Sequence, residues 1–258
     1  MDFSKVADNL RESFRILASG RELGEIRELL GVSIASSGVT FQMFNAAFLS
    51  GPVQGEAELA QRILLASLHF ESRGQEWAFW VCEDWLDDSF RKRTRKIFDQ
   101  HGLRHSVDLP GMMAHRLSPP TRLLPALDVR PVESAVTRDA FCSIGSTCFN
   151  VPLSWFREVF DSPGIWRRFR GYVGYAGGEP VSTAAIVLSD GVAGVYNVAT
   201  LPAHQRKGYG EAVMRHALAA AQRESGVEQT ILQSTHAGNR LYQRMGYRAL
   251  TNVAVYSA

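Results

Sequence analysis

Apolar residues recur at helical spacing through the first thirty residues, and the same pattern of apolar and polar positions predicts the elements that follow. The apolar positions are Phe3, Val6, Leu10 and Phe14, followed by Leu23, Ile26, Leu29 and Leu30. Because Gly20 lies between the two sets, we expect two helices. Residues 31–51 are rich in β-formers and predict two strands.

Two stretches with the same order of elements follow. Residues 56–117 predict a helix, an aromatic strand, a second helix and a strand, and residues 118–126 are a proline-rich linker. After a strand at 127–132 and a helical region at 134–160, residues 169–200 predict three strands. A helix to residue 225, a strand, a short helix and a final strand complete the pattern. We therefore expect a mixed α+β fold with a domain at 1–117, a linker at 118–126 and a related domain at 127–258.

Composition and charge narrow the function classes. With 258 residues, 45% hydrophobic and 21% charged, the chain has the make-up of a soluble globular protein with a core. A net charge of +2 does not imply nucleic acid or an anionic membrane as a partner. No apolar stretch approaches a membrane span, and the first residues lack the apolar core of a signal peptide. Three cysteines without Cys-x-x-Cys spacing favour free thiols over disulfides or a zinc site, so we expect a cytoplasmic protein without a metal.

One turn has the composition of an anion site. Gln205-Arg206-Lys207-Gly208-Tyr209-Gly210 separates a β-rich run from a strong helix former. The first amides of a helix have no intrahelical partner, its dipole is positive there, and glycines let a ligand approach the backbone. A diphosphate could bind here beside Arg206 and Lys207. The alternative is an ordinary turn with two solvated cations, and the pattern alone leaves both interpretations open.

Other phosphate-binding motifs fit this turn poorly. A Walker A loop requires Gly-Lys-Ser/Thr, and no serine or threonine follows Lys207 here. A dinucleotide fingerprint would need a third glycine where Val213 stands.

Two segments together resemble the GCN5-related N-acetyltransferases. Gln205, Gly208 and Gly210 match that family's Gln/Arg-x-x-Gly-x-Gly/Ala motif. Leu241-Tyr242 with Gly246-Tyr247 resembles its later Leu-Tyr-x-x-x-Gly-Phe/Tyr segment. The resemblance covers residues 127–258 and implies a mixed, mostly antiparallel sheet flanked by helices. Residues 1–117 resemble a degenerate copy that lacks the glycine motif, as in tandem acetyltransferase-like proteins, so we do not expect that half to bind CoA in the same way.

The resemblance implies an acyl-CoA-dependent N-acetyltransferase that uses acetyl-CoA as its donor. The loop 205–210 would hold the pyrophosphate of CoA, and the strand 196–200 would pair with the pantetheine arm. The amide of Val198 or Ala199 would stabilise the oxyanion, with Thr200 completing the strand. The acceptor amine would attack the thioester directly, without a covalent enzyme intermediate.

The resemblance implies fewer catalytic residues than cofactor-binding residues. Tyr242 stands where the family often has a general acid, and its alternative role is packing beneath the cofactor. The strand 192–200 holds no carboxylate, so Asn197 could only orient a water or the substrate, and His236 is either a base or a loop residue. The amine could also enter already deprotonated.

CoA recognition near the second motif departs from the family pattern. Thr235 stands where the family often has asparagine, with Gly238 as the small residue three positions later. Asn239 is offset by four residues from that position. Thr235 and Asn239 are therefore the candidates for cofactor contacts there.

Two further features each have two interpretations. The aromatic residues could line an acceptor pocket between the halves or belong to the core; they are Phe41, Phe44, Trp77, Phe79, Trp80 and Trp85. The basic run Arg91–Lys96 could bind RNA or form a solvated surface. A CoA-binding regulatory module without turnover is the alternative function, and nucleic-acid binding is a second rival. We expect a small-molecule or peptide amine as acceptor, no nucleic acid, no membrane, and a monomer or homodimer.

Overall fold

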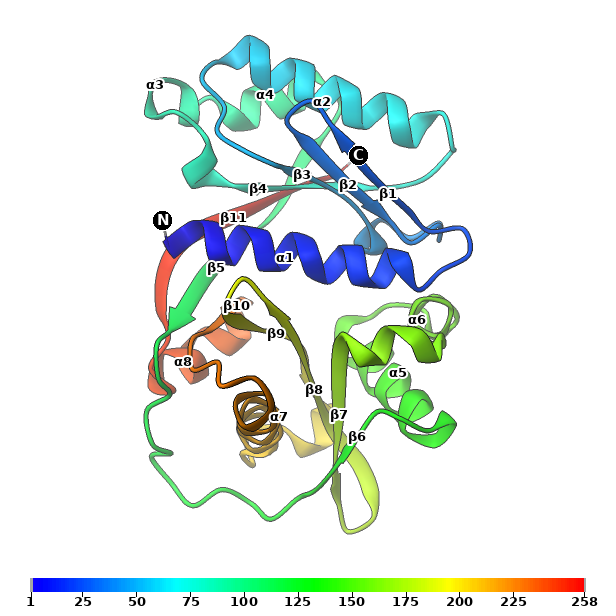
Figure 1. Ribbon diagram of the computed structural model, residues 1–258, viewed down its shortest axis with the longest axis vertical. Helices are drawn as coiled ribbons and strands as arrows, with labels where there is room; N and C mark the ends of the chain where they lie inside the picture. The colour runs from blue at the N-terminus through cyan, green and yellow to red at the C-terminus, as the bar shows by residue number, and fades with distance from the viewer. Residues whose placement is uncertain (1, 258) are drawn as a thin grey trace.

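One eleven-stranded sheet runs through residues 2–257, the part of the chain that the computed structural model describes (Figure 1). Its strand order is β1-β2-β3-β4-β11-β5-β10-β9-β8-β7-β6. The strands are β1 (Glu25–Leu29), β2 (Val32–Ser36), β3 (Asn45–Leu49), β4 (Ala78–Cys82), β5 (Arg104–Ala114), β6 (Asp128–Pro131), β7 (Phe169–Ala176), β8 (Glu179–Ser189), β9 (Val192–Thr200), β10 (Thr230–Gln233) and β11 (Arg248–Ser257). The helices are α1 (Asp2–Ser19), α2 (Glu56–Glu71), α3 (Asp88–Arg91), α4 (Thr94–Gln100), α5 (Ala135–Phe149), α6 (Leu153–Phe160), α7 (Tyr209–Ser225) and α8 (His236–Arg244).

The two halves of the sheet repeat one topology. Three antiparallel strands are followed by a helix, a strand parallel to the third, more helix and a long last strand: β1-β2-β3-α2-β4-α4-β5, then β7-β8-β9-α7-β10-α8-β11. The last strands are exchanged, because β5 pairs with β10 and β11 pairs with β4. The mixed fold and its two-half arrangement are as the sequence predicts. The domain division at residues 118–126 stays a prediction.

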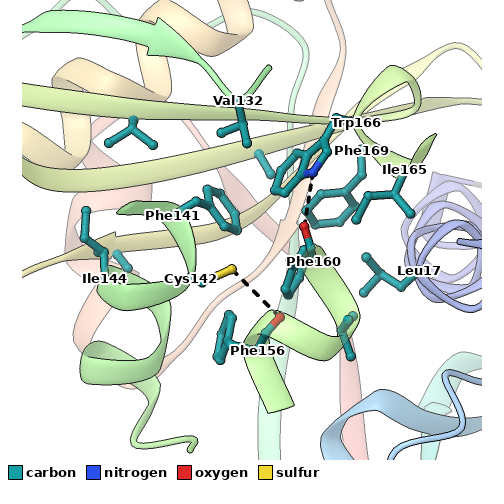
Figure 2. Close-up of a cluster of buried hydrophobic side chains, with 14 of the residues drawn as sticks. Leu17, Val132, Phe141, Cys142, Ile144, Phe156, Phe160, Ile165, Trp166 and Phe169 are labelled. Carbon is teal, nitrogen blue, oxygen red and sulfur yellow. Dashed lines mark hydrogen bonds between the residues drawn. The ribbon is translucent and has the colours of Figure 1, made fainter. Parts of the chain in front are cut away.

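Helices cover both faces of the sheet. Along β8, Ala184 and Ile186 pack in one cluster with α7 and α8, whereas Ala185 and Val187 pack on the other side with α1, α5 and α6. This alternation is the period-two pattern of a strand that is buried on both faces. Figure 2 shows the second cluster, where Leu17 of α1 lies beside aromatic rings from the C-terminal half, and Trp166 donates a 3.2 Å hydrogen bond to the carbonyl of Phe160.

Helix α1 joins the halves along the middle of the sheet (Figure 1). Its Val6 packs on β5, β9 and β10, and its Leu10 packs on β3 and β11. Asn9 is fully buried and donates to the carbonyl of Val187 at 3.1 Å. The hydroxyl of Tyr196 donates to the side-chain oxygen of Asn9 at 2.7 Å. The N-terminal half thus fixes a residue of β9 in the C-terminal half.

The predicted second helix within the first thirty residues is wrong. Residues 25–29 form β1, which pairs with β2 in a hairpin whose turn holds Gly31 at φ 76°. A left-handed residue is suited to such a turn and not to a helix. The apolar pattern gave a wrong helix prediction because Leu23 and Leu30 are 69% and 79% exposed and do not pack on the core. The second helix predicted within residues 56–117 is also interrupted, because the chain breaks between α3 and α4.

Three absences concern the described residues 2–257 only. None of their helices combines the length and apolar character of a bilayer span. No three or more of their histidine, cysteine and acidic side chains gather closely enough to hold a metal ion. Cys82, Cys142 and Cys148 form no disulfide, and burial raises the pKa of the Cys82 thiol to about 11.

Candidate functional site

Strands β9 and β10 separate toward their carboxyl ends. They pair in parallel at two positions only, Ala193 with Thr230 and Gly194 with Ile231. A bulge follows in β9, where Asn197 has φ 49° and the register against β8 shifts. β10 instead stays paired with β5 along its whole length. Within the described chain, residues 195–200 of β9 therefore have a strand partner on one side only, and a gap opens beside them.

The turn that follows β9 leads from this gap to the start of α7. A short 3₁₀ turn, Pro202–His204, precedes it, and both Arg206 (φ 62°) and Gly208 (φ 95°) are left-handed. Gln205 donates from its side chain to the carbonyl of Thr200 at 3.2 Å, which ties the turn to the end of β9. The side chains of Arg206 and Lys207 are exposed.

The backbone amides at the start of α7 have no protein acceptor. Gly208 is the N-cap and has no side chain to cap the helix. The first hydrogen bond of the helix runs from Ala212 to the carbonyl of Gly208, and no N–H between residues 206 and 211 donates to another described residue. Several donors and the positive end of a 17-residue helix thus face the same turn. This arrangement suits an anion.

An acidic residue in the first turn of α7 is neutralised by a partner that the sequence interpretation missed. Glu211 is 6% exposed and its carboxylate accepts a 2.9 Å hydrogen bond from Nε of Arg215. Without Arg215, this buried carboxylate would oppose an anion at the helix start. The i,i+4 spacing of the pair was a signal that could have identified it.

Tyr242 lies on α8 in the core on the side of α7. Its ring packs edge-on against Tyr247 at 5.9 Å, and its side chain is 8% exposed. Val198 borders the same cluster, so the cluster includes Tyr242 and the β9 segment beside the gap. The hydroxyl has no hydrogen-bond partner among residues 2–257. Burial raises the pKa of Tyr242 to about 12, so the phenol keeps its proton at neutral pH.

The other predicted catalytic side chains form no network with Tyr242. The carbonyl of Asn197 accepts a hydrogen bond from Thr183 at 2.8 Å, while its side chain is half-exposed. His236 is exposed at the start of α8. No hydrogen bond within the described chain joins Asn197, His236 and Tyr242 to one another. Within residues 2–257 these three side chains therefore do not form a hydrogen-bonded catalytic group.

The two candidates near the second motif have structural partners. The hydroxyl of Thr235 caps α8 by accepting from the amide of Gly238 at 3.3 Å. The side chain of Asn239 is half-buried, with Nδ2 4.0 Å from the sulfur of Met112. Thr235 thus has the role of a helix cap whether or not it also contacts a ligand.

The aromatic residues do not form one pocket. Trp77 and Phe79 belong to the core beneath α2 and α4, whereas Trp80 packs beside α1 on the opposite face. Phe44 is buried in a third cluster, and the half-buried Phe41 stacks on Trp155 at 4.8 Å.

The basic run carries its own counter-ions. Arg91, Arg93 and Arg95 each pair with a carboxylate, and the partners are Asp88, Glu56 and Asp108. These pairings favour the interpretation as a solvated surface over RNA binding.

Two open hollows on the surface lie away from the gap. One of about 410 Å³ lies over α1, and one of about 440 Å³ lies between α7 and the amino-terminal ends of β9 and β10. Neither is lined by a predicted site residue. The candidate site is thus an open strand gap that ends at a helix start.

Comparison with known proteins gives a family for this region. Residues 167–249 match the model of the family described as "Acetyltransferase (GNAT) domain". None of the curated proteins matches the chain in sequence.

Solved structures share the fold over nearly the whole chain. A GCN5-related N-acetyltransferase from Kribbella flavida is 18% identical with a TM-score of 0.73, covering 97% of this chain and 95% of that one. One from Sphaerobacter thermophilus is 14% identical with a TM-score of 0.62, covering 88% and 76%. A functionally unknown conserved protein from Staphylococcus epidermidis is 13% identical with a TM-score of 0.63, covering 91% and 93%. Residues 167–249, which include the strand gap and the glycine turn, thus match an acetyltransferase (GNAT) domain, within a fold that the whole chain shares with GCN5-related N-acetyltransferases.

Proposed function

We propose that the protein transfers an acetyl group from acetyl-CoA to an amine acceptor. The observation that carries this proposal is the continuity of the gap beside β9 with the free amides at the start of α7. One extended ligand with a diphosphate at one end and an amide-containing arm at the other fits both features. Acetyl-CoA has that chemistry.

The proposed binding mode follows from the donors available. The pyrophosphate accepts from the amides of residues 206–210, with Arg206 and Lys207 as countercharges. The pantetheine arm takes the place of a strand beside residues 198–200. The amide of Val198 or Ala199 then donates to the thioester oxygen and stabilises the negative charge that develops there.

The proposed reaction is a direct acyl transfer. The lone pair of the amine attacks the thioester carbon, the C–N bond forms, and the C–S bond breaks as the thiolate leaves. The phenol of Tyr242 is the proposed proton donor to that thiolate. Its pKa of about 12 exceeds that of an ordinary thiol, but a thiolate in the same apolar surroundings also has a raised pKa, which narrows the difference.

The amine must lose one proton during the reaction. Since no carboxylate lies on β9, we propose that the amine enters in its neutral form and releases this proton to water after the C–N bond forms, while solvent returns to Tyr242 the proton that it gave to the thiolate. Asn197 would orient that water from the bulge, and His236, exposed at the start of α8, is the alternative acceptor.

A CoA-binding module without turnover is the second candidate. The absence of a hydrogen bond among Asn197, His236 and Tyr242 within the described chain favours it. A panel of amines incubated with acetyl-CoA separates the two candidates, because only the enzyme releases free CoA thiol in step with an acetylated amine.

The site is tested by thermal unfolding with acetyl-CoA. A ligand at 100 times its Kd adds about 2.7 kcal/mol, which raises Tm by several degrees in a protein of this size. Gly208→Ala should abolish this rise, and Gly226→Ala should retain it. Both glycines flank α7 at positive φ, so both variants bear backbone strain, but only Gly208 lies in the turn, where an added Cβ would also lie 3.0 Å from Cδ of Pro125. An equal rise in both variants would contradict the proposed position.

The role of Tyr242 is tested by Tyr242→Phe. If Tyr242 is the general acid, the substitution should lower kcat at least tenfold while Kd for CoA stays within about twofold of the wild-type value. A variant with unchanged kcat would leave Tyr242 only its packing against Tyr247.

A further inference from the structure

The linker between the halves passes beside the glycine turn, and this contact was not predicted from the sequence. A Cβ atom placed on Gly208 would lie 3.0 Å from Cδ of Pro125 and 3.2 Å from Nη2 of Arg122. The guanidinium of a residue 86 positions earlier in the chain is therefore at the N-cap of α7.

The linker is fixed at both ends of this passage. The amide of Ser118 donates to the carbonyl of Met245, just after α8, at 2.9 Å. At the other end, Leu127 packs against the backbone of Gly174 in β7, where an added Cβ would lie 3.1 Å from its Cδ1. Three prolines between these points restrict the backbone further. Arg122 is thus held near the turn by its own segment.

Arg122 has no protein partner for its charge. It is exposed, and within residues 2–257 it forms no ion pair and no hydrogen bond. Most arginines elsewhere in the described chain do pair with a carboxylate, as Arg116 does with Glu228 at the start of the same connection. Arg206 and Lys207 also lack a carboxylate, and Glu211 is neutralised by Arg215. Three uncompensated cations therefore surround the free amides of α7.

We propose that Arg122 binds a phosphate group of CoA, so that the linker is part of the cofactor site. The inference rests on the proposed function. CoA carries a pyrophosphate and a 3′-phosphate, more negative charge than Arg206 and Lys207 alone neutralise. The guanidinium of Arg122 is a third cation at the same turn and adds one positive charge and up to two N–H donors for one phosphate.

The test compares Kd for CoA and for dephospho-CoA, which lacks the 3′-phosphate, by titration calorimetry. Arg122→Gln should raise Kd for CoA about tenfold, and Arg122→Lys should recover part of the loss. If Arg122 binds the 3′-phosphate, Arg122→Gln leaves Kd for dephospho-CoA unchanged. If it binds the pyrophosphate, both Kd values rise together. The matched control is Arg116→Gln, which removes an arginine that lies away from the turn and should change neither Kd.

Two results would overturn the inference in different ways. If Arg122→Gln binds both ligands within about twofold of the wild type, Arg122 is a solvated side chain and the proposed function stands. If the wild type itself binds neither ligand, the proposed function fails and this inference fails with it. Tm without ligand should be equal in the wild type and Arg122→Gln, because Arg122 has no partner in the protein.

Discussion

The turns that enter α2 and α7 hold equivalent places in the two halves, yet a side-chain carboxylate accepts from a backbone amide in only one of them. At the start of α2, the carboxylate of Glu58 accepts a hydrogen bond from the amide of Gln54 at 2.8 Å. At the start of α7, no side chain does this, and the acidic residue Glu211 turns toward Arg215 instead. The N-terminal half thus places a carboxylate of its own on a backbone amide of this turn, and the C-terminal half places none there.

The spaces between the two parallel strands of each half also differ: hydrogen bonds close the one beyond β3 and β4, and the one beyond β9 and β10 stays open. Beyond the paired part of β3 and β4, Val53 donates from its amide to the carbonyl of Trp85 at 2.7 Å and accepts from the amide of Asp87 at 3.1 Å. These bonds join the segment that follows β3 to the segment that follows β4. No such bonds follow the two paired positions of β9 and β10 in the described chain. An added strand-like ligand therefore has an edge to pair with in one half only.

Arg62 completes the closure of the N-terminal turn. Its guanidinium donates to the carbonyls of Gly51 and Pro52, both at 2.8 Å, and pairs with Glu58. The residue is 9% exposed, so its charge is almost removed from water. In the N-terminal half the turn thus packs on a buried cation, Arg62. In the C-terminal half the turn itself carries the exposed cations Arg206 and Lys207. This difference, together with the missing glycine motif, is the physical reason why we expect the N-terminal half not to bind CoA in the same way.

The largest expected effect is on stability, from Arg62→Met. The substitution leaves the carbonyls of Gly51 and Pro52 and the carboxylate of Glu58 without their donor. We expect a loss of about 3 kcal/mol of unfolding free energy, measured by denaturant titration. Kd for CoA at a temperature where the variant is folded should not change.

Arg95→Met is the control for that variant. Arg95 pairs with Asp108 on the surface, its side chain is 63% exposed, and its loss should cost less than about 1 kcal/mol. A similar cost for both variants would show that Arg62 does not hold the N-terminal turn closed.

The next effect is on ligand affinity, from Gly210→Glu, which gives the start of α7 a carboxylate like those of α2. Repulsion between carboxylate and pyrophosphate should raise Kd for CoA about 100-fold. Gly210→Gln is the matched control, because its added atoms meet Thr200 equally but carry no charge. A glutamate near a helix start favours the helix, so Tm of the Glu variant should equal or exceed that of the Gln variant. Equal Kd values in the two variants would exclude an anion at this turn.

The sequence predicted most of the fold because its signals were local. Apolar periodicity marked α1 and α2, and Gly177-Gly178 and Ser189-Asp190-Gly191 marked the turns of the later hairpins. The prediction failed at residues 25–29, where pairing with β2 outweighs a helical apolar pattern whose Leu23 and Leu30 stay exposed. The exchange of β5 and β11 could not be predicted from the sequence, since it depends on contacts between segments far apart in the chain.

Local sequence likewise predicted one part of the candidate site and did not predict the rest. Its glycine turn stood in the sequence as one contiguous motif, and the free amides follow from the helix start. The gap beside β9 depends on a bulge at Asn197, with φ 49°. Asparagine tolerates the left-handed region better than most residues, but its identity alone does not place a bulge within a strand. Arg122 reaches the turn only through the path of the linker, and nothing in its neighbours' identities indicates where that path runs.

The smallest expected effect is the pH dependence contributed by Glu58. The hydrogen bond from the amide of Gln54, followed by Arg62, lowers the pKa of Glu58 below its ordinary value of 4.5. The folded protein therefore favours the carboxylate, and Glu58 stabilises the fold above about pH 4.5 and loses this contribution as the pH falls through its lowered pKa. Denaturant titration should show Glu58→Gln less stable than the wild type at pH 7, with a smaller difference at pH 3.5.

Glu22→Gln, at an exposed residue with no ion pair among residues 2–257, should show no such change with pH. A stability difference for Glu58→Gln that is the same at both pH values would mean that the shape of the side chain, and not its charge, closes the turn. In that case the N-terminal half would not be using a carboxylate where the C-terminal half is proposed to use a phosphate, and the two turns would differ in packing alone.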